Sequence, residues 1–192
     1  MRIFVITILL ILNTLVLVKC STLQQPEINN TMNQEILQIT SNNFENGGMI
    51  PVKHATKNGE GKNISPQISW PTLPIAKSYA VLLDDKHPIA NGWVHWLIVN
   101  IPSSTISIPE GASRTVQMAE VGMELTTSWN KTGYDGPQPP IGSGSHEYVI
   151  TLYALDTEQL DLTPENTKQD FLRAAEDHII TQKRLSGYFE RN

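Results

Sequence analysis

The stretch Tyr79–Pro102, Y-A-V-L-L-D-D-K-H-P-I-A-N-G-W-V-H-W-L-I-V-N-I-P, decides how this chain folds. It contains two apolar runs, residues 79–83 and 93–101, on either side of a polar segment rich in turn-forming residues. Apolar, β-branched runs bounded by Asp, Pro, Asn and Gly predict two neighbouring β-strands. Both faces of the second run are apolar, so we expect that strand to be buried on both sides.

Ionisable side chains interrupt this apolar pair. Asp84 ends the first predicted strand, and His95 stands between two tryptophans in the second. Regular strand alternation places Trp93 on the same face as His95, and Val94 with Trp96 on the other face. A buried ionisable side chain requires a partner or a function, so Asp84 and His95 are candidate site residues.

The composition predicts one globular domain. The chain has 192 residues, of which 40% are apolar and 17% are charged, and its net charge is −5. A nucleic-acid surface requires a basic stripe, so no nucleic-acid partner is expected. Cys20 is the single cysteine, which excludes a disulfide within the domain that follows it.

The first 20 residues have the pattern of a targeting segment. Met1-Arg2 precede a short apolar run, residues 3–18, which favours a signal peptide over a permanent membrane span. Two outcomes stay open: cleavage (or retention as an uncleaved anchor), or lipidation of Cys20 in a lipobox-like Leu17–Cys20. We therefore expect an exported protein, periplasmic or secreted, that contacts a membrane only through its N-terminal segment. Residues 21–35 form a polar tether, and residues 36–192 form the domain.

Elsewhere, strands are predicted over residues 36–40 and 148–155. The stretch 128–145 is a long loop rich in Pro and Gly, with aromatic residues that favour order and a function. The tail predicts a C-terminal helix that begins at Thr163-Pro164. Apolar residues recur at helical spacing along it: Phe171, Leu172, Ala175 and Ile179. This order predicts a mainly β (α+β) protein of antiparallel sheet with peripheral helices.

Three kinds of site are compatible with Asp84, His95 and His146. Imidazole donors and a carboxylate can form an anion pocket. The same three side chains could bind a metal, although they lack short ligand spacing. Ser143 or Ser145 could act as a nucleophile, although G-S-G-S is not the G-x-S-x-G elbow. Each of the three residues also has an ordinary structural explanation, and we expect His54 and His178 to be structural or solvent-facing.

Five ordered motifs resemble the phosphatidylethanolamine-binding protein (PEBP) family, in particular its prokaryotic Raf-kinase-inhibitor-like branch. They are N-I-S-P-Q-I-S-W (63–70), D-D-K-H-P (84–88), W-V-H-W-L-I-V-N-I-P (93–102), K-T-G-Y-D-G-P-Q-P-P (131–140) and H-E-Y (146–148). The resemblance covers residues 36–190 and implies two antiparallel β-sheets with a small anion pocket for phosphate-like groups, including phospholipid head groups. The ligand-binding residues that it implies are Asp84, Pro88, His95, Pro140, His146 and Tyr148.

Two positions depart from the family pattern. Lys86 stands where the family has its second Asp, and Glu147 replaces the Arg of its H-R-Y triplet. Our hypothesis is that Lys86 and Glu147 form an inverted salt bridge at the pocket rim. Asp85 and His87 also replace the Pro and Ala of the family's D-P-D-A-P motif.

The function expected from the sequence is non-enzymatic binding of a small phosphorylated or otherwise anionic ligand, with no metal and no cofactor. The alternative is inhibition or regulation of a partner enzyme, a protease or a kinase, through a surface epitope. Substitution of His95 or His146 distinguishes these functions, because only the first depends on the pocket.

Overall fold

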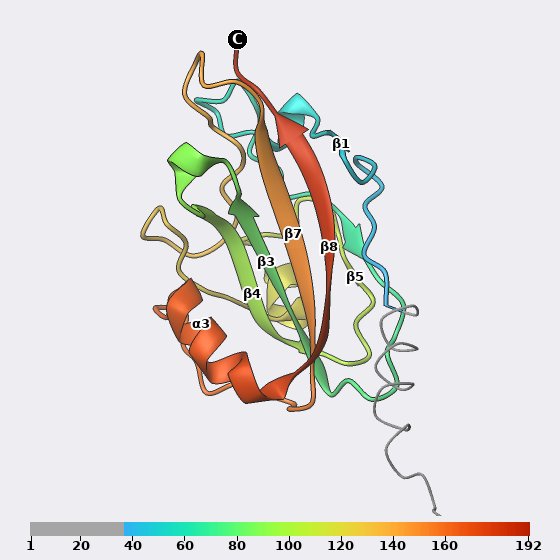
Figure 1. The fold of residues 1–192 in the computed structure, drawn as a ribbon. Coiled ribbons are helices and arrows are strands. Elements are labelled where there is room, and N and C mark those ends of the chain that lie inside the picture. The colour runs from blue at the N-terminus through green and yellow to red at the C-terminus, as the bar shows by residue number, and fades with distance from the viewer. Residues whose placement is uncertain (1–36) are drawn as a thin grey trace, which may run out of the picture.

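A computed structural model describes residues 37–192, and its main element is a six-stranded sheet of order β1-β8-β7-β3-β4-β6 (Figure 1). The strands are β1 (Gly48–Met49), β3 (Ser78–Asp85), β4 (Val94–Pro102), β6 (Met123–Glu124), β7 (His146–Leu155) and β8 (Ile179–Phe189). Every neighbouring pair is antiparallel except β1 with β8, which is parallel.

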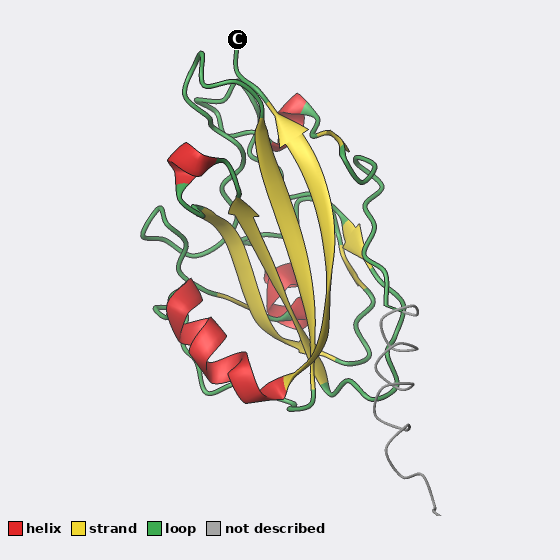
Figure 2. Ribbon diagram, viewed as in Figure 1, coloured by secondary structure: helices red, strands yellow, loops and turns green. Residues whose placement is uncertain are grey.

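A small antiparallel ribbon and short helices surround this sheet (Figure 2). The ribbon pairs β2 (Ile68–Ser69) with β5 (Ser107–Ile108). The helices are α2 (Val116–Val121), α3 (Lys168–Ala175) and the 3-10 turns η1 (Val52–His54), η2 (Pro88–Ala90) and η3 (Glu176–His178). The predicted class, mainly β with two sheets and peripheral helices, is confirmed.

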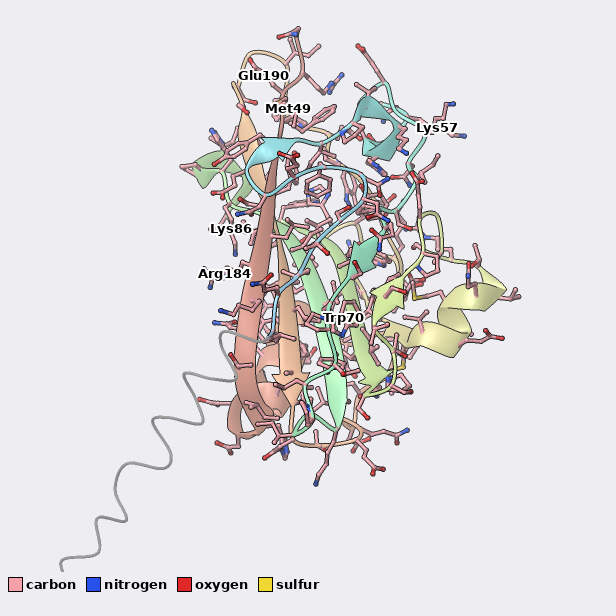
Figure 3. The ribbon with its side chains drawn as sticks, turned by 90° about the vertical axis from the view of Figure 1, so that its right-hand side faces the viewer. Met49, Lys57, Trp70, Lys86, Arg184 and Glu190 are labelled. Carbon is pink, nitrogen blue, oxygen red and sulfur yellow. The ribbon has the colours of Figure 1, made fainter. Side chains whose placement is uncertain are left out.

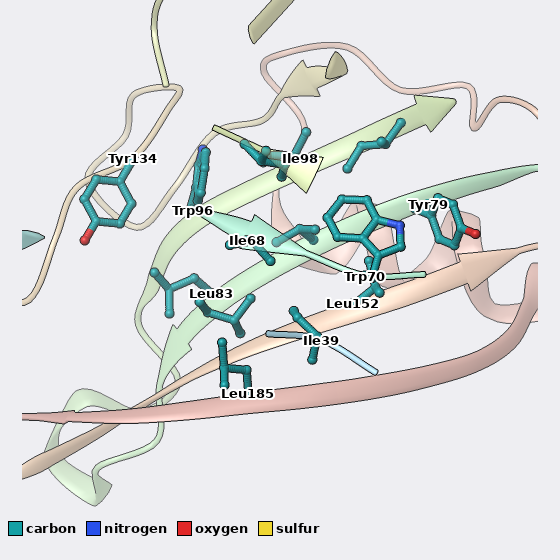
Figure 4. Close-up of a cluster of buried hydrophobic side chains, with 14 of the residues drawn as sticks. Ile39, Ile68, Trp70, Tyr79, Leu83, Trp96, Ile98, Tyr134, Leu152 and Leu185 are labelled. Atoms are coloured by element: carbon teal, nitrogen blue, oxygen red, sulfur yellow. The ribbon is translucent and has the colours of Figure 1, made fainter. Parts of the chain in front are cut away.

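Two buried apolar clusters cover opposite faces of the large sheet, as the run of apolar residues in the central strands requires. One cluster joins the sheet to the β2–β5 ribbon and to Trp70 and Tyr134 (Figure 4). The other packs the sheet against α3 through Phe171 and Ala175. Figure 3 shows the ribbon side of the molecule, with Trp70 in front of the sheet and Met49 beside the end of β8.

The predicted β3–β4 pair forms, but β4 is not a regular strand. Leu83 pairs with Trp96 while Asp84 pairs with Val94, so His95 is an extra residue that forms a β-bulge. Trp96 therefore belongs to the ribbon-side cluster and Val94 to the α3-side cluster. The prediction that Val94 and Trp96 share a face was wrong, because a bulge shifts the alternation by one residue.

The tail differs from its prediction at both ends. Helix α3 begins at Lys168, because Thr167 caps it: the Thr167 backbone N–H donates to Asp170 Oδ2 at 2.9 Å. This arrangement is a capping box, and it starts the helix at a later position than the predicted start at Thr163-Pro164. After residue 178 the chain forms β8, which pairs with β7 from His146↔Phe189 to Leu155↔Ile179. The prediction of helix through Ile179 was wrong, since the long β7–β8 pairing outweighs a weak helical pattern.

At the start of the described chain, residues 37–40 form no regular strand. Thr40 makes an isolated antiparallel bridge with Ser69, while Leu37 and Ile39 are buried in the ribbon-side cluster. The predicted targeting segment, the fate of Cys20 and the predicted tether lie outside the described residues. Within residues 37–192, no helix combines the length and the apolar character that crossing a bilayer requires.

Phe171 tests the packing of α3 on the sheet. Phe171 is fully buried, while its neighbour Leu172 is 37% exposed. We expect Phe171→Ala to lower the free energy of unfolding by about 3–5 kcal/mol, because it leaves a cavity between helix and sheet. The matched control Leu172→Ala should cost less than about 1 kcal/mol. Urea unfolding measures both, and equal costs would contradict this packing.

Candidate functional site

A pocket of about 280 Å³ opens where the ends of β3, β4 and β7 meet the loop 128–145. Its walls combine ionisable, aromatic and prolyl side chains. The lining residues are Asp85, Ile89, Ala90, Trp93, His95, Trp129, Gln138, Pro139, Pro140, His146 and Tyr148. Three predicted strand ends therefore converge on one concave site, as ligand sites require.

Asp85 and His146 form the polar centre of the pocket. His146 Nδ1 lies 2.6 Å from Asp85 Oδ2, and the other carboxylate oxygen, Oδ1, accepts the His87 backbone N–H at 2.8 Å. The His87 ring stacks on the His146 ring, with centroids 3.9 Å apart and planes 16° apart. Both oxygens of Asp85 are thus hydrogen-bonded, and Oδ2 fixes the orientation of His146.

His95 is held by the loop through its backbone and its ring. Its carbonyl accepts the Asp135 N–H at 3.0 Å, and its Nδ1 lies 2.6 Å from the Asp135 carbonyl oxygen. A carbonyl only accepts, so Nδ1 carries the proton and Nε2 is the nitrogen available to a ligand. Burial lowers the pKa of His95, although the nearby Asp85 charge opposes this. His95 is therefore neutral at pH 7, with an acceptor nitrogen at the pocket.

Tyr148 contributes a buried hydroxyl. The side chain is 1% exposed, lines the pocket, and its hydroxyl has no hydrogen-bond partner within residues 37–192. Desolvation, followed by the negative charge of Asp85, raises the pKa of Tyr148 above its ordinary value of 10. The hydroxyl therefore keeps its proton, and an unpaired donor of this kind is costly unless a ligand or water accepts from it.

The loop 128–145 is held by a buried carboxylate, Asp135. Asp135 accepts from Arg114 Nη2 at 2.8 Å and from Lys131 Nζ at 3.0 Å. Gly136 follows it, where a Cβ would overlap the carbonyl oxygen of His54. These contacts hold Pro139 and Pro140 at the pocket wall and give the predicted order of this loop a physical basis.

Asp84 does not line the pocket, which corrects the sequence prediction. Its side chain is fully buried on the other face of β3, where Oδ2 lies 2.7 Å from Lys86 Nζ and 2.6 Å from Lys168 Nζ. Adjacent residues of a strand point to opposite faces, so the pocket carboxylate is Asp85.

The Lys86–Glu147 salt bridge was also predicted wrongly. The two residues share only a backbone bond, from the Lys86 N–H to the Glu147 carbonyl oxygen at 2.8 Å. The Lys86 ammonium turns to Asp84 instead, and among the described residues no ion pair involves Glu147. The predicted ion pair does not form, because the Lys86 ammonium binds the buried Asp84 carboxylate. Strand pairing brings together only the backbones of Lys86 and Glu147.

The other predicted residues divide between rim and interior. Pro140 lines the pocket with His95, His146 and Tyr148, whereas Pro88 begins η2, whose next residues Ile89 and Ala90 form the wall. Asp85, Trp93, Trp129 and Gln138 were not predicted as site residues. For Asp85 the sequence did contain a signal. Side chains alternate along the predicted strand, so Asp85 and Asp84 must point to opposite faces.

The alternative readings of the histidines also have a structural outcome. Within residues 37–192, no three His, Cys, Asp or Glu side chains are grouped as metal ligands. His54 is buried, with Nδ1 2.7 Å from the Ile64 carbonyl oxygen, and His178 is a half-exposed partner of Asp156. Both have structural contacts away from the pocket.

Comparison with known proteins identifies the family. The sequence model described as phosphatidylethanolamine-binding protein matches residues 40–190. A protein of Methanothermobacter thermautotrophicus named UPF0098 protein is 35% identical over 156 residues, which are 81% of this chain and 99% of that protein. Escherichia coli YbcL, whose crystal structure is described as a new member of the mammalian PEBP family, superposes with a TM-score of 0.76 at 26% identity, covering 82% of this chain and 99% of that one. The chain belongs to the PEBP family.

A further relative bears on location. A Mycobacterium tuberculosis protein whose name classes it as a lipoprotein, LppC, is 33% identical over 156 residues, 81% of this chain and 73% of that protein. A lipoprotein relative is compatible with export. Membership of the PEBP family supports ligand binding or regulation in general, and neither the family description nor these names denote an enzyme.

The lowered pKa of His95 predicts acid sensitivity. At pH values between the lowered pKa of native His95 and the ordinary pKa of 6.5, His95 is protonated in the unfolded chain but not in the native protein. Stability is therefore complete above pH 6.5 and falls as the pH drops below it, by up to about 1.4 kcal/mol per pH unit for one proton. We expect His95→Asn, whose amide can replace the Nδ1–H donor, to show a shallower slope. Chemical unfolding between pH 5 and 7.5 measures both slopes; equal slopes would count against a neutral, buried His95.

Proposed function

We propose that the pocket binds a small ligand that carries a phosphate group, such as a phosphate ester or a phospholipid head group. The observation that carries the proposal is the unpaired Tyr148 hydroxyl, which is buried at the pocket wall and keeps its proton. An acceptor oxygen from a ligand removes the cost of this unpaired donor. The family name, which specifies a phosphate-bearing lipid, supports the same class of ligand.

Other polar groups of the pocket refine the chemistry. Gln138 Oε1 accepts from the Thr56 hydroxyl at 2.7 Å, which leaves the amide nitrogen as a second donor. Neutral His95 offers the opposite, an acceptor at Nε2. A ligand with acceptor oxygens for the Tyr148 hydroxyl and the Gln138 amide, and with one proton to donate to His95 Nε2, satisfies these three groups. A phosphate monoester that holds one proton has these features.

The apolar wall accommodates the organic part of such a ligand. Trp93 and Trp129 meet edge to face, with ring centroids 5.4 Å apart and planes 80° apart, and Ile89 lies beside them. Aromatic faces attract ammonium groups as well as apolar atoms. A head group with a phosphate and an ammonium therefore suits the two sides of the pocket.

We also propose that the protein is exported and encounters its ligand outside the cytoplasm. The N-terminal targeting pattern and the lipoprotein relative support this location. Inhibition of a partner enzyme has no specific structural observation in its favour, and the binding experiments below separate it from ligand capture.

Tyr148→Phe tests the proposed donor. We expect the affinity for inorganic phosphate and phosphorylethanolamine to fall about tenfold to a hundredfold, since a hydrogen bond to a charged group contributes about 1.5–3 kcal/mol. Tyr153→Phe is the matched control, because Tyr153 lies on β7 but in the α3-side cluster. Calorimetric titration gives both affinities. Absence of binding by the folded wild type would reject the proposal and leave the partner-enzyme function to be tested.

Binding of a monoester should weaken between pH 6 and pH 8. A phosphate monoester loses its second proton near pH 6, and with it the donor for His95 Nε2. Burial lowers the pKa of His95 and so favours its neutral form over this range. Titration with phosphorylethanolamine should therefore give a higher affinity at pH 6, while a phosphodiester head group, which does not titrate there, should bind with little change. A monoester affinity that is independent of pH would contradict the role assigned to His95.

A further inference from the structure

Ser143, His146 and Asp85 form one continuous line of hydrogen bonds beside the pocket. Ser143 Oγ lies 2.9 Å from His146 Nε2, and His146 Nδ1 lies 2.6 Å from Asp85 Oδ2. In this connectivity a histidine can remove the proton of a serine while a carboxylate orients the ring. We propose that Ser143 is a catalytic nucleophile toward small carboxylic esters, an activity that goes beyond the proposed phosphate binding.

The carboxylate end of the line is built for orientation. Asp85 is 4% exposed, and its second oxygen is fixed by the His87 N–H. A carboxylate accepts from the Nδ1–H of His146, and in that tautomer the lone pair of Nε2 is directed at Ser143. Stacking on His87 restrains the ring further. His146 therefore presents to the serine the nitrogen that a general base requires.

The serine end is accessible and sits in a sharp turn. Ser143 is partly exposed and lies between Gly142 and Gly144, whose φ angles are +79° and +81°. Its hydroxyl has a second acceptor, the Pro140 carbonyl oxygen at 2.7 Å, so its single proton can point to either group. When the proton points to His146, the oxygen is ready for attack. The turn lacks the helix of a G-x-S-x-G elbow, but such constellations are defined by geometry and not by sequence position.

Two neighbouring features supply the rest of an acyl-transfer site. The Gly144 N–H donates to no acceptor in the described part of the chain, and the residue after the nucleophile is the usual source of an oxyanion donor. Pro140 and His146, the two partners of Ser143, both line the pocket. Its volume of about 280 Å³, at the lower end for small-molecule sites, suits a short acyl or alcohol group beside the tryptophans.

The reaction follows from these positions. Ser143 Oγ forms a bond to the ester carbonyl carbon as its proton passes to His146 Nε2, and the carbonyl oxygen becomes an oxyanion near the Gly144 N–H. The carbon–oxygen bond to the alcohol then breaks, and the alcohol leaves with the proton from His146. Water repeats the sequence on the acyl-serine, giving its proton to His146, and the acid and the free serine result.

A fluorophosphonate probe and p-nitrophenyl acetate test the nucleophile on the full chain. We expect one phosphonyl adduct per chain, located by peptide mass spectrometry at Ser143, and release of p-nitrophenol above the buffer rate. Ser143→Ala should lose the adduct and at least tenfold of the rate. The matched control Ser145→Ala, an exposed serine of the same loop with no bond to His146, should keep both.

Three outcomes would overturn the proposal. A folded wild type that takes no label shows that the Ser143–His146 bond only stabilises the turn. Equal turnover by wild type and Ser143→Ala shows catalysis by another group, as does a label on another residue. Asp85 is a positioning residue, so Asp85→Asn should slow labelling and remove the downfield Nδ1 proton signal of His146 from the NMR spectrum. Phosphate binding through Tyr148 is measured separately, so the two proposals can fail independently.

Discussion

The β-bulge at His95 is the constraint on which the site depends. An extra residue in β4 lets Val94 and Trp96 fill opposite clusters while His95 turns toward the loop 128–145. The loop then pairs with the strand through both the N–H and the carbonyl of Asp135. In a regular strand His95 would point to the face opposite Trp96. The loop that carries the prolines of the pocket wall would then lose its side-chain hydrogen bond to His95. The site therefore follows from an irregularity in pairing as much as from the residues that line it.

The two adjacent carboxylates at the end of β3 illustrate how strand geometry assigns roles. Asp84 faces α3 and holds Lys86 and Lys168, so it ties the helix to the sheet. Asp85 faces the pocket and holds His146. The two residues are chemically identical and adjacent in sequence, and only the alternation of side chains along the strand separates a structural carboxylate from a site carboxylate.

The sequence was sufficient for the features that depend on local pattern. The paired strands at 79–83 and 93–101, the strand that begins near His146 and the ordered Pro-rich loop all follow from apolar runs and turn residues. It was insufficient where the outcome depends on distant partners. Strand β8 is stabilised by its pairing with β7, and α3 begins after Thr167, whose backbone N–H donates to Asp170. The bulge at His95 is bonded to Asp135, a loop residue 40 positions further along the chain.

The distribution of charge explains why the chemistry of the pocket rests on histidine. Three buried carboxylates lie near it, and two of them are neutralised by cations: Asp84 by two lysines, and Asp135 by Arg114 and Lys131. Asp85 is paired with an imidazole alone, and no lysine or arginine lines the described pocket. Fixed positive charge from a lysine or an arginine would attract any anion. A pocket lined by imidazoles and hydroxyl groups instead recognises a ligand through hydrogen bonds, and in the proposed reaction His146 exchanges a proton with Ser143.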